Sequence, residues 1–305
     1  ADENDRYCVA IPMFHCFSMT SNLLAAWMTG AAVVLPQDRK TDHIFCTVQE
    51  KRCTILSAVP TLYSALMANK NRENYDISSL RTGIIGGSLY SEVFFKRVCN
   101  VLHINLIASF GQTEATSCIT CCDYNDSLEV RASTLGHFLP GVEGVIKNPK
   151  TGEKLPVRQI GEICFKGFNV MKGYYKQPEM TAKTIDQEGF VHTGDLGFID
   201  ENGYLHMTGR LKEMIIRGGE NIYPKEIEDL VYSLPEIKEC ALVAKPDAKW
   251  GQVPILFVSG NISQEKLENF LTEKLAKYKR PQSITFMDEL PKNASGKILR
   301  KELKG

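Results

Sequence analysis

The sequence predicts an α/β protein in three successive parts. Residues 1–122 have the pattern of a parallel α/β sheet, residues 123–209 that of mostly antiparallel β structure, and residues 210–305 that of a small α+β domain. Three observations support this prediction. Short apolar runs alternate with helical patterns in the first part, glycine and proline divide short alternating segments in the second, and the pattern changes at residues 204–228.

In the first part, apolar runs predict strands, and patterns with helical spacing predict helices between them. The predicted strands are residues 7–11, 31–35, 54–58, 82–85 and 104–109, and the predicted helices are residues 22–28, 42–51, 61–69 and 91–102. Near-continuous apolar strands separated by helices are typical of a parallel sheet covered on both faces. Ligands of such sheets bind at the carboxyl ends of the strands, where residues 12–16, 86–88 and 110–114 stand.

The second part is predicted to form a small barrel or a distorted antiparallel sheet. Closely spaced glycines and prolines separate short alternating segments such as GEICFKG at residues 161–167. The pair Asn202-Gly203 stands between two such segments and predicts a β-hairpin, because Asn-Gly tolerates the positive φ angles of a tight turn.

Residues 204–228 form the junction with the third part. The end of a strand is followed by a charged connector around Lys212, a short apolar strand, the pair Gly218-Gly219 and a helix with a proline in its first turn. We therefore expect the domain boundary between Gly209 and Lys212, and two bodies that move relative to each other. Further elements are expected as helices at 224–234 and 263–277 and strands at 239–244 and 253–258.

Composition narrows the class of protein. Lys+Arg and Asp+Glu are equal at 36 each, so the chain has no net charge that would attract it to nucleic acid or to a membrane surface. No run approaches the ~18 apolar residues of a membrane span, and the acidic N-terminus lacks the apolar core of an export signal.

Ten scattered cysteines indicate free thiols in a reducing compartment, and we expect a cytoplasmic protein. The pair Cys118 and Cys121 has no second Cys/His pair nearby and is interpreted as structural.

The segment 110–114, FGQTE, follows a predicted buried strand directly and has the side chains of a nucleotide site. Phe110 can stack on a base, Thr113 can donate to a phosphate oxygen, and Glu114 can bind Mg²⁺ through a hard carboxylate oxygen. A strand end with a polar turn explains the same residues without any ligand.

Two further residues suit a nucleotide. The Asp195 carboxylate, expected to be exposed in a cleft, can accept hydrogen bonds from ribose hydroxyls, and the Arg210 guanidinium suits phosphate and ribose oxygens. The structural alternatives are a turn-stabilising Asp and a surface ion pair.

Two other candidates could act in the chemistry. Lys297 follows a polar loop and can stabilise the negative charge that builds when a carboxylate joins an α-phosphate. The alternative interpretation is a solvated lysine near the C-terminus without a catalytic role. His15 stands just past the first strand, and a structural histidine is its alternative.

Five stretches in the same order resemble those of the adenylate-forming superfamily, which includes acyl-CoA synthetases, firefly luciferase and peptide-synthetase adenylation domains. They are residues 12–15, 110–114, 193–195, 204–228, and 291–293 with Gly296-Lys297. Residues 217–223 are most similar to the medium- and long-chain fatty acyl-CoA synthetases. The resemblance implies that residues 1–209 are the C-terminal part of an AMP-binding N-domain, and that residues 210–305 are a mobile C-terminal domain.

The resemblance also assigns roles. Lys297 would be catalytic, His15 a gate between acyl pocket and thiol tunnel, and Lys212 the hinge. The nucleotide-binding residues would be Gly87, Ser88, Phe110, Gly111, Gln112, Thr113, Asp195 and Arg210, the CoA-binding residues Gly218 and Gly219, and the Mg²⁺ ligand Glu114. The family usually has Tyr where Phe110 stands, so stacking is retained and a hydroxyl is lost.

The implied function is an ATP-dependent, AMP-forming acyl-CoA ligase that uses ATP, Mg²⁺ and CoA to activate a carboxylic acid, a fatty acid by the branch it resembles. The family's phosphate-binding loop, expected well before Pro12, does not stand in this sequence. We therefore interpret the chain as a truncated synthetase whose activity alone is in doubt. A non-catalytic AMP- or CoA-binding remnant, or a partner-assembling fragment, is the alternative. Chain length of the acid, oligomeric state and pathway stay open.

Overall fold

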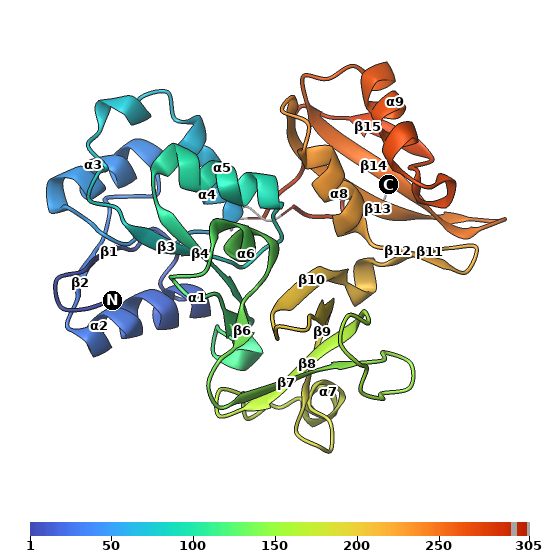
Figure 1. Ribbon diagram of the computed structural model, residues 1–305, viewed down its shortest axis with the longest axis horizontal. Helices are drawn as coiled ribbons and strands as arrows, with labels where there is room; N and C mark the ends of the chain where they lie inside the picture. The colour runs from blue at the N-terminus through green and yellow to red at the C-terminus, as the bar shows by residue number, and fades with distance from the viewer. Residues whose placement is uncertain (294–297, 304–305) are drawn as a thin grey trace. The chain divides into compact units, whose positions relative to one another are not determined.

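The protein is described by a computed structural model covering residues 1–293 and 298–303 (Figure 1). The chain forms two compact units. The first consists of residues 1–193 and 197–207, and the second of residues 194–196 and the described residues from 208 onward. Helices and sheets occur in both units, so the predicted α/β class is confirmed.

The first unit contains the predicted parallel strands. They are β1 (Arg6–Cys8), β2 (Ala32–Val34), β3 (Thr82–Ile85) and β4 (Asn105–Phe110). β1 pairs with β2, and β3 with β4, both in parallel register. The predicted strand at 54–58 makes only single parallel bridges, from Ile55 to Tyr7 and Thr82 and from Ala58 to Ile85. These bridges connect β1 with β3 at the expected position.

Helices cover both faces of this sheet. The helices are α1 (Cys16–Ser18), the π-helical turn Met19–Leu24, α2 (Ala25–Thr29), α3 (Thr41–Lys51), α4 (Pro60–Ala68) and α5 (Glu92–Leu102), with the 3₁₀ turn Arg72–Asn74 after α4. Cys8 packs with residues of α3, α4 and α5, whereas Tyr7 packs with Ala26 of α2. Because successive strand residues point to opposite faces, this alternation places a core on each side of the sheet.

The predicted helix 22–28 begins earlier than expected, and its first part is π-helical. The Thr20 hydroxyl donates to the Cys16 carbonyl at 2.8 Å, the oxygen that an α-helical N–H of residue 20 would use. A hydroxyl that takes an i−4 carbonyl in this way loosens the helical ladder. Apolar spacing alone could not reveal this.

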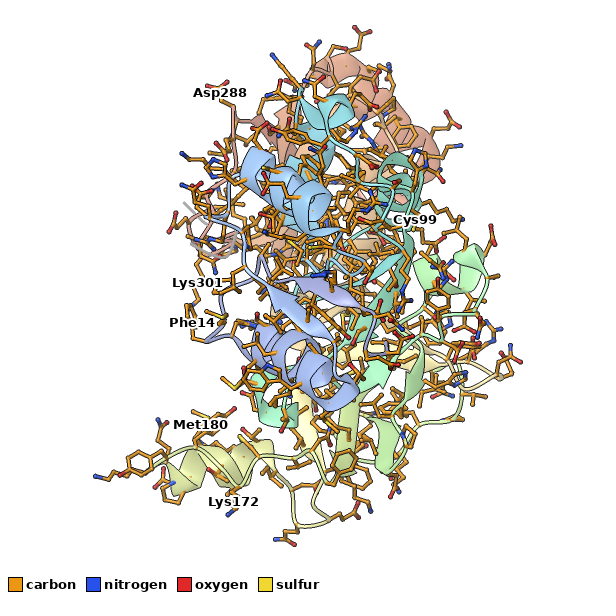
Figure 2. All side chains as sticks on the ribbon, turned by 90° about the vertical axis from the view of Figure 1, so that its left-hand side faces the viewer. Phe14, Cys99, Lys172, Met180, Asp288 and Lys301 are labelled. Carbon is orange, nitrogen blue, oxygen red and sulfur yellow. The ribbon has the colours of Figure 1, made fainter. Side chains whose placement is uncertain are left out.

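Antiparallel structure follows, as predicted. Its strands are β5 (Thr120–Cys121), β6 (His137–Phe138), β7 (Val142–Lys147), β8 (Gly161–Gly167), β9 (Val191–Ile199) and β10 (Leu205–Arg210), with the 3₁₀ turn Thr113–Ala115 and helices α6 (Leu128–Ser133) and α7 (Pro178–Thr184). β5 and β6 extend the first sheet, and the other four form a sheet in the order β10-β9-β8-β7. The hairpin between β9 and β10 is confirmed, and Gly203 has a φ of 84°. Figure 2 shows α7, with Met180, extending away from these strands.

The second unit is an α+β structure. Its elements are the 3₁₀ turn Leu211–Glu213, β11 (Ile215–Arg217), β12 (Glu220–Ile222), α8 (Pro224–Tyr232), β13 (Ile237–Asp247), β14 (Gly251–Gly260), α9 (Gln264–Lys274), the 3₁₀ turn Lys277–Lys279 and β15 (Ser283–Phe286). The strand order is β12-β11-β14-β13, and β15 pairs in parallel with β14. Sequence analysis missed β15, whose residues are half-buried or exposed and which is held by its partner strand. No helix among the described residues has the length and apolar character needed to cross a membrane.

Candidate functional site

Two residues predicted to bind a nucleotide lie together on neighbouring strands of the second sheet. Arg210 Nε, at the end of β10, lies 3.1 Å from Asp195 Oδ1 on β9. Asp195 is 5% exposed, so the expectation of a carboxylate open to a cleft is wrong. The carboxylate is buried and its charge is offset by a guanidinium. The ion pair fixes the positions of both side chains, and their role in binding a nucleotide stays a prediction.

The segment after β4 is shaped by close approach of the backbone. A Cβ at Gly111 would lie 1.5 Å from the Ser117 carbonyl oxygen, so only glycine fits there. Thr116 and Ser117 have φ angles of 52° and 91°, an uncommon conformation that side-chain-bearing residues adopt at a cost. Thr113 is exposed, whereas Phe110 is 8% exposed and packs in an apolar core with Ile119. Base stacking by Phe110 stays a prediction.

Glu114 is tied to a distant segment of the first unit. Its carboxylate accepts a 2.7 Å hydrogen bond from the Tyr174 hydroxyl, which raises the pKa of Tyr174. Its backbone carbonyl accepts from the Met171 amide at 2.9 Å. A carboxylate has about four lone-pair sites, so the tyrosine bond leaves room for a hard cation such as Mg²⁺. Sequence analysis missed Tyr174, because no local pattern links residues sixty positions apart.

His15 and Thr113 lie close together in the first unit. His15 Nδ1 accepts from the Phe17 amide at 3.2 Å and caps α1. Cys16 Sγ lies 3.9 Å from His15 Nδ1 and 3.5 Å from Thr113 Oγ1. The loop after β1 therefore meets the loop after β4, as expected for carboxyl ends of parallel strands. Phe14, beside His15, is 85% exposed (Figure 2).

Gly87 and Ser88 follow β3 at the same edge. Gly87 has a φ of 81°, which favours glycine, and Ser88 is half-buried. The segment thus turns sharply at the end of its strand. A direct role in binding stays a prediction.

In the second unit, Gly218 and Gly219 form the turn between β11 and β12. Their φ angles are 59° and 92°, and a Cβ at Gly218 would lie 2.8 Å from the Trp250 ring. The Gly218 amide donates to the Trp250 carbonyl at 2.8 Å. Trp250 was not singled out in the sequence, although it is one of only two tryptophans. Lys212 is exposed on the preceding 3₁₀ turn, and Lys297 lies outside the described residues.

Comparison with known families now identifies the chain. A family model described as AMP-binding enzyme matches residues 1–175, and one described as AMP-binding enzyme C-terminal domain matches residues 226–297. The chain belongs to the AMP-binding enzyme family. This confirms the superfamily that the five motifs predicted.

Individual members of the AMP-binding enzyme family match the whole chain. The 2-succinylbenzoate–CoA ligase of Lactococcus lactis is 48% identical over 100% of this chain and 63% of its own length. The 4-coumarate–CoA ligase 2 of Nicotiana tabacum is 35% identical over 99% of this chain and 57% of its own length. The solved o-succinylbenzoate CoA synthetase of Bacillus subtilis, in complex with the acyl-adenylate OSB-AMP, is 32% identical with a TM-score of 0.87 and covers 100% of this chain and 61% of that one. The chain thus spans about 60% of these relatives.

These similarities change the expected branch of the family. The two relatives are named for 2-succinylbenzoate and 4-coumarate, which are aromatic carboxylic acids. The sequence of residues 217–223 had instead predicted a fatty acyl-CoA synthetase. In the structure the Gly218 turn packs on Trp250, a contact within the second unit.

Proposed function

We propose that this protein is an ATP-dependent, AMP-forming acyl-CoA ligase that acts on an aromatic carboxylic acid of the 2-succinylbenzoate type. The observation that carries the proposal is the 48% identity to a 2-succinylbenzoate–CoA ligase over the whole chain. The buried Asp195–Arg210 pair and the Gly111 turn support it, because both belong to segments predicted to bind a nucleotide. An aromatic acid takes the place of the fatty acid expected earlier.

The proposed reaction has two steps. A carboxylate oxygen attacks the α-phosphorus of ATP, and the bond from that phosphorus to pyrophosphate breaks. The CoA thiol then attacks the acyl carbon and loses its proton, the acyl carbon–oxygen bond breaks, and AMP leaves. Enzymes stabilise such steps by positioning and by charges aimed at the transition state.

We assign the roles as follows. Asp195 and Arg210 hold the ribose and phosphate of the nucleotide, and Thr113 donates to a phosphate oxygen. Glu114 would hold Mg²⁺, which supplies positive charge to the phosphates when bound. Lys297 stabilises the first transition state. Phe110, Gly111, Gln112, Gly87 and Ser88 complete the proposed nucleotide site.

We also propose that residues 1–209 and 210–305 act as two domains. Rotation about Lys212 would exchange the Lys297 loop for the Gly218-Gly219 turn, so one site performs both steps. Three features support this: the exposed position of Lys212, its 3₁₀ turn, and the φ angles of the glycine turn. His15 is the proposed gate for the thiol.

The alternative is a protein that binds AMP or CoA without catalysis. A substrate panel separates the two in the natural full-length protein: 2-succinylbenzoate, 4-coumarate and an unbranched fatty acid, each with ATP, Mg²⁺ and CoA. The proposal predicts acid-dependent pyrophosphate release and a thioester detected by mass spectrometry, with an aromatic acid preferred. Turnover of the fatty acid alone would contradict the proposed substrate. Nucleotide binding without any turnover would favour the non-catalytic alternative.

A further inference from the structure

A cluster of metal-ligand side chains lies on the second sheet of the first unit. Glu162 and Cys164 stand two residues apart on β8 and share a face of that strand, and His192 stands on the neighbouring β9. The carboxylate oxygen, the thiol sulfur and the ring nitrogen all lie within 4.8 Å of one another. Within residues 1–293 and 298–303, this is the only group of three or more such side chains so arranged.

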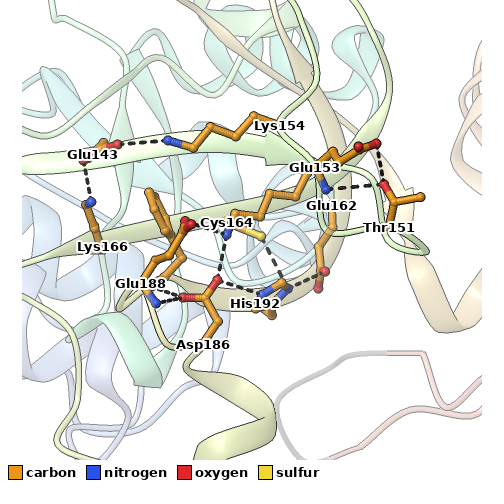
Figure 3. Close-up of polar contacts among 12 residues, drawn as sticks. Glu143, Thr151, Glu153, Lys154, Glu162, Cys164, Lys166, Asp186, Glu188 and His192 are labelled. Atoms are coloured by element: carbon orange, nitrogen blue, oxygen red, sulfur yellow. Dashed lines mark hydrogen bonds and ion pairs between the residues drawn. The ribbon is translucent and has the colours of Figure 1, made fainter.

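The orientation of His192 is fixed at both ring nitrogens (Figure 3). Nδ1 lies 2.8 Å from Glu162 Oε2 and 3.6 Å from Cys164 Sγ, so one nitrogen faces both other ligand atoms. Nε2 lies 3.3 Å from Asp186 Oδ2 on the opposite side of the ring. Metal-binding histidines commonly donate their second N–H to a carboxylate in this way, which fixes the tautomer.

We propose that Glu162, Cys164 and His192 bind a divalent transition-metal ion, with Zn²⁺ as the best fit, and that Asp186 orients His192 for this purpose. A set of one sulfur, one nitrogen and one carboxylate oxygen suits zinc, which binds all three ligand types in tetrahedral geometry. Three protein ligands leave a fourth position for water. This site is independent of the nucleotide site and of the proposed ligase activity.

The charge and burial of the three proposed ligands suit a divalent metal ion. Cys164 is fully buried, Glu162 is 7% exposed, and the His192 side chain is 28% exposed, so access is from the histidine side. A carboxylate and a thiolate together balance the charge of a divalent ion. The nearby Lys147 ammonium is already offset, because its Nζ lies 2.7 Å from Asp186 Oδ2 and 3.4 Å from Glu188 Oε2.

Binding would be linked to proton release. A thiol binds a metal ion as the thiolate, so Cys164 must lose its proton when the ion binds. The metal displaces this proton to solvent as the sulfur–metal bond forms. The bound ion would join β8 to β9 at a point three residues before Asp195.

Cobalt(II) titration tests the site, because thiolate-bound Co²⁺ gives a charge-transfer absorption band. We expect the full-length protein to bind Co²⁺ at one site with this band, and Zn²⁺ to displace it. Cys164→Ser should abolish the band. Cys46→Ser is the matched control: Cys46 Sγ donates to Glu50 Oε1 at 3.2 Å, a cysteine–carboxylate pair outside the three-residue cluster, so the band should persist.

Two further variants keep the test decisive if Cys164→Ser does not fold. His192→Gln should abolish high-affinity binding, and Asp186→Asn should weaken it about 10- to 100-fold, as loss of an orienting carboxylate typically does. Absence of the band in the wild-type protein would overturn the proposal. So would a band that survives both Cys164→Ser and His192→Gln. Either result would leave the cluster as a hydrogen-bond network only.

Discussion

Glu228 and Arg300 form a two-point ion pair inside the second unit. Arg300 Nη1 lies 2.6 Å from Glu228 Oε1, and Nη2 lies 2.8 Å from Oε2. Arg300 Nε also lies 3.2 Å from Glu213 Oε2. Glu213 stands beside Lys212, and Arg300 follows Lys297 by three residues. The half-buried Arg300 guanidinium thus connects the proposed hinge segment and helix α8 with the segment that follows the proposed catalytic lysine.

Glu228→Gln should strongly destabilise the second unit. The Glu228 side chain is 7% exposed, and its Oε1 also accepts from the Leu242 amide at 2.6 Å. Removing the Glu228 charge leaves Arg300 with only the longer Glu213 contact, and breaking a buried pair costs up to about 3–5 kcal/mol. Thermal unfolding measures the effect. The control is Glu273→Gln, whose pair with Lys274 is exposed to solvent and should contribute little to stability. Equal small effects would contradict the prediction.

Asp195→Asn should weaken AMP binding and lower stability together. The substitution removes the charge proposed to accept from ribose hydroxyls, and the expected loss is about 1.5–3 kcal/mol, or roughly a tenfold to hundredfold higher Kd. It also leaves Arg210 without this ionic partner. Calorimetric titration with AMP and a melting curve test both effects. Glu201→Gln, which breaks an ion pair between the turn of the same hairpin and Arg158, is the control. Unchanged affinity with a large fall in Tm would make Asp195 a structural residue.

The sequence was sufficient for much of the fold, because periodicity reports burial directly. β3 has the predicted bounds, and α3, α4 and α5 begin or end within a residue of expectation. The short strand β15 and the π-helical turn depend on tertiary pairing and on a side-chain hydrogen bond, which periodicity does not encode. The burial of Asp195 was missed for the same reason: its partner Arg210 comes from the next strand.

Some residues of the candidate sites could be predicted from the sequence and others could not. Gly111 and Gly218 could be found because a glycine in a motif signals a position that a side chain tolerates poorly. A Cβ at Gly111 would meet the Ser117 carbonyl, and Gly218 has a φ of 59°. Tyr174, Trp250 and the Glu162–Cys164–His192 cluster were not found, because their contacts join segments far apart in the chain. The acid proposed as substrate rests on the names of relatives and not on any residue of the site.

Stability should fall between about pH 4 and pH 2 through Asp5. Burial alone would raise the pKa of this carboxyl, but hydrogen bonds from Arg81 and Thr54 outweigh it and lower the pKa from 3.8 to about 2. Because the folded-state pKa is below the unfolded value, the ionised group stabilises the fold above about pH 4, and this contribution is lost as the pH falls through 2. The shift corresponds to about 2 kcal/mol.

Denaturant unfolding at several pH values between 2 and 6 measures this contribution. The Asp5→Asn variant should be less stable at pH 6 and should lose part of the acid dependence. Asp76→Asn, which removes an exposed partner of Arg52, should retain it. An Asp5→Asn profile parallel to that of the wild-type protein would contradict the prediction.

Lys297→Ala, made in the full-length protein, should separate the two steps. Adenylate formation from ATP and free acid should slow by about 10²–10³, the usual cost of removing a preorganised electrostatic donor. Thioester formation from synthetic acyl-adenylate and CoA should stay near the wild-type rate. Lys301→Ala, an exposed lysine four residues on, is the control. Equal losses in both assays would contradict alternation of the two domains, and no loss in either would leave Lys297 a surface residue.

Transfer of oxygen from the acid to AMP tests the central claim most directly. The full-length protein would be given 2-succinylbenzoate with ¹⁸O in its carboxylates, together with ATP, Mg²⁺ and CoA, and the products analysed by mass spectrometry. If the carboxylate attacks the α-phosphorus and CoA then breaks the acyl carbon–oxygen bond, each AMP formed carries one ¹⁸O atom and pyrophosphate carries none. Thioester formed with label in inorganic phosphate, or with unlabelled AMP, would contradict an acyl-adenylate and the AMP-forming ligase proposed for this chain.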